Sequence, residues 1–208
     1  KKNIVIKFLN QSIYKNWVFE IYEDELKGTA GTIFNNLKKF TNKRLLVIHA
    51  DNWSDCNLSD FVDYHFYKRP KNTILTMMTF HTDEPRNCGV VETDKLGVVK
   101  SFHEKSENPP NNIANAAIYC LEPEVLNWIN LNENIQDFST EVIPKFLGRV
   151  ATWRNKRIHR DIGTIENLKI AQKDHIQKIN WIPDKYWETF FKKHKIHQIM
   201  KDLKIYKQ

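Results

Sequence analysis

Two aspartates from distant segments of the chain could together hold a divalent cation. Asp51 follows the continuous apolar run 45–50, and Asp161 precedes a predicted helix at 166–173. In open α/β folds, ligands bind beyond the carboxyl ends of the strands. Mg²⁺ takes one or two carboxylates and completes its shell with phosphate oxygens and water. The pair is therefore a candidate Mg²⁺ site, although Asp51 taken alone fits a structural helix cap equally well.

A second polar pair lies between these aspartates in the sequence. Glu104 and Lys105 follow a predicted strand at 98–102. At the end of a strand, the carboxylate can accept hydrogen bonds from hydroxyl groups, and the ammonium group can hold a phosphate. The alternative is a solvated surface pair, which the spacing alone favours.

The elements that must position these residues alternate between strand-like and helix-like patterns. Strands are predicted at 3–8, 17–22, 45–50, 73–80, 88–92, 98–102 and 113–121. A turn at 28–31 leads into a predicted helix that ends at residue 40, and further helices are predicted at 58–67, 123–129, 140–147 and 166–173. Pro123 is expected to begin its helix, and Ser139 to cap the next one. The strands 88–92 and 98–102 flank a turn that contains Gly97, which predicts a hairpin. The pattern predicts an α/β, Rossmann-like fold: a mainly parallel sheet flanked by helices, with a small antiparallel insertion.

The composition excludes several classes of protein. Of 208 residues, 41% are hydrophobic and 12% aromatic, so the chain can bury a core and is not generally disordered. No apolar run reaches the roughly 18 residues of a membrane span, and no secretory segment opens the chain. The three cysteines have no zinc-like spacing. We expect reduced thiols and a cytoplasmic protein without membrane partners.

The last part of the chain differs from the rest. From about residue 180, aromatic and aliphatic residues recur at helical spacing among lysines, which predicts an amphipathic helical tail. We divide the chain into a domain at 1–175 and this tail at 176–208. The tail is expected to lie on the domain or on a second subunit, which would give a homo-oligomer. The net charge of +7 falls largely in the tail. Nucleic acid is therefore a weaker alternative partner.

Seven segments, in order and approximate spacing, resemble the sugar-1-phosphate nucleotidyltransferase family over about residues 1–175. The similarity is greatest to the bacterial guanylyltransferases that act on mannose or heptose 1-phosphate. The segments are residues 28–31 (Gly-Thr-Ala-Gly), 48–51, 88–91, 102–105, 115–119, 137–144 and 161–164. The resemblance implies transfer of a nucleoside monophosphate to a sugar 1-phosphate with release of pyrophosphate, and the similarity to guanylyltransferases implies GTP as its source.

The resemblance also implies roles for individual residues. Asp51 and Asp161 would hold Mg²⁺ and, with Lys105, form the catalytic group. On the sugar side, Glu104 would bind hydroxyl groups, Lys105 the sugar phosphate, and Gly89 and Asn115 would line the pocket. On the nucleotide side, the implied residues are Gly28, Thr29, Ala30 and Glu23.

The sequence departs from the family pattern at several positions. Ala50 and Ala117 replace glycines, and Ser106 and Ile165 replace prolines. No segment matches the family's Gly-Gly-x-Gly-Thr-Arg-Leu loop, the chain begins with Lys1, and its first methionine is Met77. We therefore expect an N-terminally truncated chain that does not catalyse transfer alone. The alternative function is a non-catalytic binding or assembly subunit of the same fold.

Overall fold

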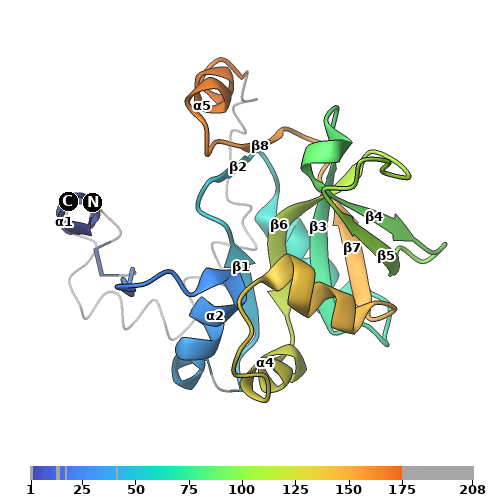
Figure 1. Cartoon of the computed structure of the whole chain (residues 1–208), viewed down its shortest axis with the longest axis horizontal. Helices are drawn as coiled ribbons and strands as arrows, with labels where there is room; N and C mark the ends of the chain where they lie inside the picture. The colour runs from blue at the N-terminus through green and yellow to red at the C-terminus, as the bar shows by residue number, and fades with distance from the viewer. Residues whose placement is uncertain (1, 13–14, 17, 41, 175–208) are drawn as a thin grey trace, which may run out of the picture. The chain divides into compact units, whose positions relative to one another are not determined.

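Six strands form the central sheet of the computed structural model, which describes residues 2–12, 15–16, 18–40 and 42–174 (Figure 1). The sheet strands are β1 (Leu45–Ile48), β3 (Leu75–His81), β4 (Gly89–Thr93), β5 (Val99–Glu104), β6 (Ile113–Leu121) and β7 (Val150–Arg154). A separate pair consists of β2 (Asn52–Ser54) and β8 (His159–Asp161). The helices are α1 (Lys2–Gln11), α2 (Gly28–Asn35), α3 (Leu58–Asp63), α4 (Pro123–Asn130) and α5 (Ile165–Ala171). Shorter helical segments are η1 (Leu37–Lys39), η2 (Tyr64–Lys68), η3 (Pro85–Asn87), η4 (Phe138–Val142) and η5 (Ile143–Phe146).

The strand order is β5-β4-β6-β3-β7, and β1 pairs with the edge of β6 opposite β3. Strand β6 runs antiparallel to β1, β3 and β4, whereas β3 and β7 are parallel. Strands β1, β3, β4 and β7 therefore point the same way, and β5 and β6 point the opposite way. The α/β class is confirmed, and the sheet is mixed because β6 lies antiparallel in its middle. The residue types of a strand buried on both faces do not reveal its direction.

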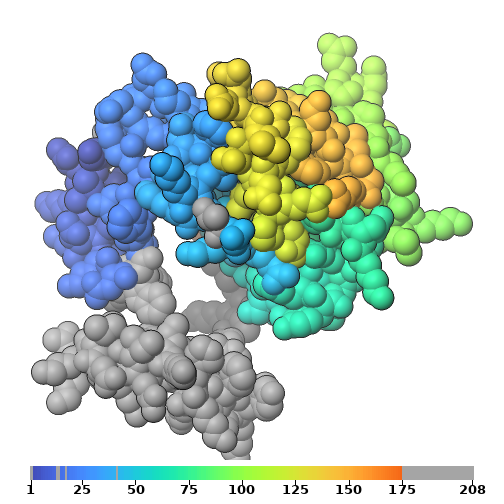
Figure 2. All heavy atoms as spheres, turned by 90° about the horizontal axis from the view of Figure 1, so that it is seen from below, coloured from blue at the N-terminus to red at the C-terminus, as the bar shows by residue number. Residues whose placement is uncertain are grey.

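The core lies on both faces of the sheet because successive strand side chains alternate between faces. Leu75 and Met77 of β3 pack with α2 and α4 on one face. Met78 packs with Phe61 of α3 on the other face. Figure 2 shows α4 and the segment after it (yellow) lying between the chain around α2 (blue) and that around β7 (orange).

The start of α4 agrees with the sequence prediction, whereas the N-cap of η4 does not. Pro123 stands in the first turn of α4, as predicted. The prediction that Ser139 caps the helix after residue 139 is wrong, because Asp137 is the N-cap of η4. The Asp137 carboxylate accepts a hydrogen bond of 2.7 Å from the backbone N–H of Thr140. Aspartate caps strongly because a charged oxygen satisfies a free helix N–H.

The two strands predicted nearest the N-terminus are not present. Residues 3–8 lie within helix α1, and residues 18–22 belong to no helix or strand. A helix satisfies its own backbone groups, whereas an apolar run becomes a strand only beside a partner strand.

The predicted tail at 176–208 lies outside the described residues, so its helical character and the boundary after residue 175 remain predictions. Within the residues that the structure does describe, no helix is long and apolar enough to cross a membrane.

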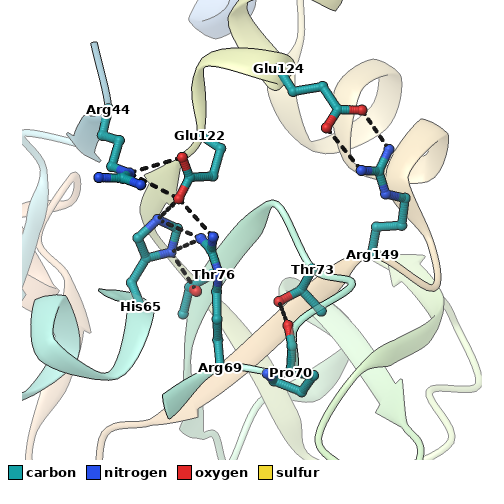
Figure 3. Close-up of polar contacts among 9 residues, drawn as sticks. All are labelled: Arg44, His65, Arg69, Pro70, Thr73, Thr76, Glu122, Glu124 and Arg149. Carbon is teal, nitrogen blue, oxygen red and sulfur yellow. Dashed lines mark hydrogen bonds and ion pairs between the residues drawn. The ribbon is translucent and has the colours of Figure 1, made fainter. Parts of the chain in front are cut away.

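An ionic network ties three elements together at the end of β1 away from Asp51 (Figure 3). The Glu122 carboxylate accepts from Arg44 at 2.9 Å and from Arg69 at 2.7 Å. His65, which is 1% exposed, lies beside this carboxylate and bonds the Thr76 hydroxyl at 2.8 Å. Burial and the nearby Arg69 lower the pKa of His65 to about 4. The imidazole is therefore neutral at pH 7.

Candidate active site

The two aspartates predicted to bind metal lie at one place in the fold. Asp51 follows β1, and Asp161 ends β8, where it pairs with Asn52 across the β2–β8 ladder. The backbone N–H of Ile162 donates to the Asp51 carbonyl oxygen at 2.7 Å. Strands from distant parts of the sequence thus bring the two residues side by side.

Gly163 shows how close the two carboxylates are. Its backbone N–H donates to Asp161 Oδ1 at 2.7 Å. A Cβ atom placed on Gly163 would lie 2.9 Å from Asp161 Oδ1 and 3.8 Å from Asp51 Oδ2. Both carboxylates therefore face the space that a side chain at residue 163 would fill.

This donor set fits Mg²⁺ better than a metal held wholly by protein. No group of three or more His, Cys, Asp or Glu side chains that could hold a metal occurs among the described residues. Mg²⁺ needs only one or two carboxylates, because phosphate oxygens and water complete its octahedral shell. Asp51 and Asp161 are the residues that would hold it.

His159 lies two residues before Asp161 in β8 and contacts residues on β2 and β3. Its Nδ1 atom lies 2.5 Å from the Ser54 hydroxyl, and its ring lies 4.2 Å from the Phe80 ring, centroid to centroid. Burial lowers the pKa of His159 to about 4. The ring is neutral at pH 7 and adds no positive charge beside the aspartates.

The sugar-side residues meet across the β4–β5 hairpin. Gly89 pairs with Glu104 in the ladder. A Cβ atom on Gly89 would lie 2.6 Å from Glu104 Oε2 and 2.5 Å from Phe102 Cζ, closer than packed atoms approach. Glycine at residue 89 therefore leaves the space that the Glu104 carboxylate occupies.

The surroundings raise the pKa values of two groups near the β4–β5 hairpin, Glu104 and Cys88. Burial raises the pKa of Glu104, Lys105 opposes the rise, and Asp137 adds to it. Burial also raises the pKa of the Cys88 thiol; contact with Thr82 opposes the rise, and the Glu104 and Asp161 carboxylates add to it.

Lys105 projects from a strained turn at the end of β5. Its φ angle is 46°, and its backbone N–H donates to the Cys88 carbonyl oxygen at 3.1 Å. A non-glycine residue in this left-handed region costs about 1–2 kcal/mol. Its side chain is exposed, so the ammonium group is available to a ligand.

Asn115 is held by two internal hydrogen bonds. Its Nδ2 donates to the Tyr119 hydroxyl at 2.7 Å, and its Oδ1 accepts from the backbone N–H of Ala117 at 3.0 Å. Ala117 has a φ of 51° and lies where β6 bulges opposite β3. This backbone conformation explains why glycine suits residue 117. Ala50 is the other alanine at a position where the family has glycine. Its φ is not positive, so its methyl group adds no such strain.

The Gly28–Gly31 turn begins α2 and packs against the segment before η4. Gly28 has a φ of 77°, and a Cβ atom there would lie 2.5 Å from the Gln136 carbonyl oxygen. The backbone N–H groups of Ala30 and Gly31 donate to that oxygen at 2.8 and 3.3 Å. Thr29 Oγ1 accepts from the Phe138 N–H at 2.8 Å. Of the predicted nucleotide-binding residues, Thr29 lines the neighbouring pocket.

The pocket itself joins the turn to Asp51. It encloses about 650 Å³ and is lined mainly by apolar groups. Its lining residues are Thr29, Thr32, Ile33, Val47, Ile48, His49, Ala50, Asp51 and Phe138. Glu23 lies behind Thr32, whose hydroxyl donates to Glu23 Oε2 at 3.1 Å. The other carboxylate oxygen, Oε1, is buried and has no hydrogen-bond partner among the described residues.

Sequence reasoning missed the residues that connect these parts. Asp137, Phe138 and Tyr119 carried no assigned role, although 137–144 and 115–119 stood among the family-like segments. The fold places all three between the Gly28–Gly31 turn and Asn115. The spacing from Asp137 to Thr140 fits a helix cap, and this signal could have identified Asp137.

Comparison with known proteins agrees with this geometry. Residues 7–178 match the model of the family described as nucleotidyl transferase. A glucose-1-phosphate adenylyltransferase of Thermotoga neapolitana is 31% identical over 69% of this chain and 37% of its own length. A mannose-1-phosphate guanylyltransferase of Mycobacterium tuberculosis is 28% identical over 76% of this chain and 44% of its own length. The chain spans less than half of these relatives.

Solved structures share the fold. HddC from Yersinia pseudotuberculosis complexed with GMP-PN is 22% identical, with a TM-score of 0.68 over 83% of this chain and 73% of that one. A putative glucose-1-phosphate thymidylyltransferase from Bacillus anthracis is 18% identical, with a TM-score of 0.70 over 82% and 70%. The family match covers most of the chain, and the shared fold agrees with it. The chain therefore belongs to the nucleotidyl transferase family.

Proposed function

We propose that the site transfers a nucleoside monophosphate from a nucleoside triphosphate to a sugar 1-phosphate, with Mg²⁺ as cofactor. The observation that carries this proposal is the convergence of Asp51 and Asp161 on the space at Gly163. Two carboxylates that share a cation at the edge of a pocket are suited to bind a metal–triphosphate complex.

The reaction requires alignment of two phosphate groups more than covalent help from the protein. A phosphate oxygen of the sugar 1-phosphate attacks the α-phosphorus, the bond from that phosphorus to the bridging oxygen breaks, and pyrophosphate leaves. When bound between Asp51 and Asp161, Mg²⁺ would neutralise charge on the reacting phosphates. Lys105 would hold the sugar phosphate with its exposed ammonium group.

The sugar would occupy the side of the site formed by Gly89, Glu104 and Asn115. The Glu104 carboxylate accepts hydrogen bonds from hydroxyl groups, and Gly89 leaves room for it. Asn115 has one amide hydrogen free of the bond to Tyr119, and it can donate this hydrogen to a sugar oxygen. We propose a mannose- or heptose-type sugar, in line with the similarity to a mannose-1-phosphate guanylyltransferase.

The nucleotide would lie in the pocket between the Gly28–Gly31 turn and Asp51. The absence of a Cβ atom at Gly28 lets the turn pack against the Gln136 carbonyl oxygen, and Thr29 of this turn lines the pocket. We propose GTP as the nucleotide, in line with the similarity to a mannose-1-phosphate guanylyltransferase. Glu23 would act indirectly, through the hydrogen bond that it accepts from Thr32 of the pocket wall.

The function is tested by pyrophosphate release from the protein as its gene encodes it. GTP, ATP and dTTP are each combined with mannose 1-phosphate, a heptose 1-phosphate or glucose 1-phosphate in the presence of Mg²⁺. We expect turnover with GTP and a mannose- or heptose-type substrate. Turnover with another pair would change the proposed specificity, and no turnover with any pair would refute the proposed activity.

The 208-residue chain is tested separately, because no glycine-rich loop of the family pattern occurs in its sequence. We expect it to bind sugar 1-phosphate in calorimetry and to release pyrophosphate at the background rate. Anion-binding loops stabilise charge in the transition state, and loss of one good donor costs on the order of 10²–10³ in rate. Robust turnover by this chain would contradict the expectation.

A further inference from the structure

Four residues form a continuous path of contacts between the proposed nucleotide side and the proposed sugar side of the site. Thr29 lies in the turn that faces the proposed nucleotide, and Asn115 lies on the proposed sugar side. Between them stand Phe138 and Tyr119, whose side chains are 1% and 0% exposed. Their burial means that neither side chain can move without disturbing its neighbours.

The contacts along this path are direct. Thr29 Oγ1 accepts a hydrogen bond of 2.8 Å from the Phe138 backbone N–H. The Phe138 and Tyr119 rings lie 4.7 Å apart, centroid to centroid, at 37°. The Tyr119 hydroxyl accepts from Asn115 Nδ2 at 2.7 Å. The path thus runs from the turn, through two adjacent rings tilted against each other, to the amide of Asn115.

A second connection fixes the same segment. Thr29 Oγ1 lies 3.4 Å from Asp137 Oδ2 and donates to it. The carbonyl oxygen of Gln136 accepts from two amides of the turn. Residues 136–138 are therefore placed by the turn, and any shift of the turn reaches Phe138.

We propose that Thr29, Phe138 and Tyr119 are positioning residues that couple the binding of the two substrates. A nucleotide that fixes the turn also fixes Phe138 and Tyr119, and so presents Asn115 to the sugar phosphate. This inference rests on the proposed function. Coupling is reciprocal by thermodynamic necessity, so the sugar phosphate must strengthen nucleotide binding by the same factor.

The test measures this factor directly. Calorimetry gives the affinity of mannose 1-phosphate for the protein as its gene encodes it, with and without a GTP analogue that carries a β–γ imido bridge, in Mg²⁺. We expect the analogue to strengthen sugar-phosphate binding by about fivefold or more. The reverse titration should give the same ratio within error.

Two variants separate coupling from simple loss of structure. Thr29→Val removes the acceptor for the Phe138 N–H, and Tyr119→Phe keeps the ring but removes the hydroxyl that holds Asn115. In both, the ratio should fall towards one, whereas Thr29→Ser keeps the hydroxyl and should keep the ratio. A merely structural role would weaken binding equally with and without the analogue, and the ratio would stay unchanged.

The outcomes distinguish this inference from the proposed function. If both ligands bind the wild-type protein with a ratio of one, the coupling is refuted and the proposed function stands. The coupling is also refuted if Thr29→Val retains the wild-type ratio. If the protein binds neither ligand, the proposed assignment of the pocket fails and the coupling fails with it.

Discussion

At the scale of single residues, the site depends on two glycines that have no side chain to fill the space beside a carboxylate. Gly163 leaves the space that Asp51 and Asp161 face, and Gly89 leaves the space that Glu104 fills. In each case the side chain with the assigned chemistry comes from another strand or loop. A larger residue would occupy the ligand space or displace the carboxylate.

Replacing Asp161 by Asn should weaken cation binding. The amide keeps the shape but loses the charge that attracts a hard cation. We expect Mn²⁺, used as a probe for Mg²⁺, to bind about tenfold or more weakly, on the scale of metal-site perturbations. The measurement is electron paramagnetic resonance of free Mn²⁺. Asp63→Asn, an exposed aspartate on α3, is the control and should leave the affinity unchanged.

Lys105 should matter for the sugar phosphate more than for the nucleotide. Lys105→Ala removes one charged hydrogen bond to a phosphate, a loss of about 1.5–3 kcal/mol. We expect the KM for sugar 1-phosphate to rise tenfold or more, with a small change in the KM for the triphosphate. The matched control is Lys100→Ala, which removes an exposed lysine paired with Asp94 on the same hairpin. Equal increases in both KM values would argue against the assignment.

At the scale of elements, strand β6 decides how the site is arranged. It pairs with β1 and β4 on one edge and with β3 on the other, so it connects the Asp51 strand with the β4–β5 hairpin that carries Glu104. The register between β3 and β6 shifts where Asn115 to Ala117 pass through the bulge. Bulges re-aim side chains near active sites, and this one places Asn115 beside Tyr119.

Ala117→Gly should stabilise the fold. Ala117 has a φ of 51°, which strains a residue with a Cβ atom and which glycine adopts freely. We expect a gain of about 0.5–1 kcal/mol in the free energy of unfolding, measured by urea denaturation. Ala116→Gly is the control, because Ala116 is fully buried and lacks a positive φ. That variant should lose stability, and a loss in both variants would show that the bulge does not require glycine.

At the scale of the described domain, the ionic network around Glu122 joins the start of β1, η2 and the link from β6 to α4 (Figure 3). It stands at the end of β1 remote from Asp51. His65 enters this network in the neutral form, since its pKa is lowered to about 4 by burial and by Arg69. The stability of the domain must therefore depend on pH.

Stability should fall as the pH drops from 6.5 towards 4. In this window the unfolded chain binds a proton on His65 that the folded chain does not bind. One such group contributes a slope of at most about 1.4 kcal/mol per pH unit. The test compares the urea unfolding midpoints of the wild type with those of His65→Gln from pH 7 to 4.5. The variant should be less stable at pH 7 but should show a shallower slope, and identical slopes would exclude His65 as a cause.

The sequence by itself determined the fold class, most of the central elements and the identity of the candidate residues. The runs that became β1, β3, β4, β5 and β6 were predicted as strands because their residue types carry the signal locally. Asp51 and Asp161 were predicted to share one Mg²⁺ because the cation takes one or two carboxylates and because the family resemblance assigns both residues to the metal. The N-terminal apolar run was misassigned because helix and strand compete for such a run, and a strand requires a partner that local sequence does not show.

Only the tertiary structure decided the direction of β6, the cap at Asp137, the space at Gly163 and the path from Thr29 to Asn115. Each depends on contacts between residues far apart in the sequence, such as Thr29 with Phe138. Side-chain type and local spacing do not encode these long-range contacts. They arise when strands pair in one register and when the core excludes every other packing.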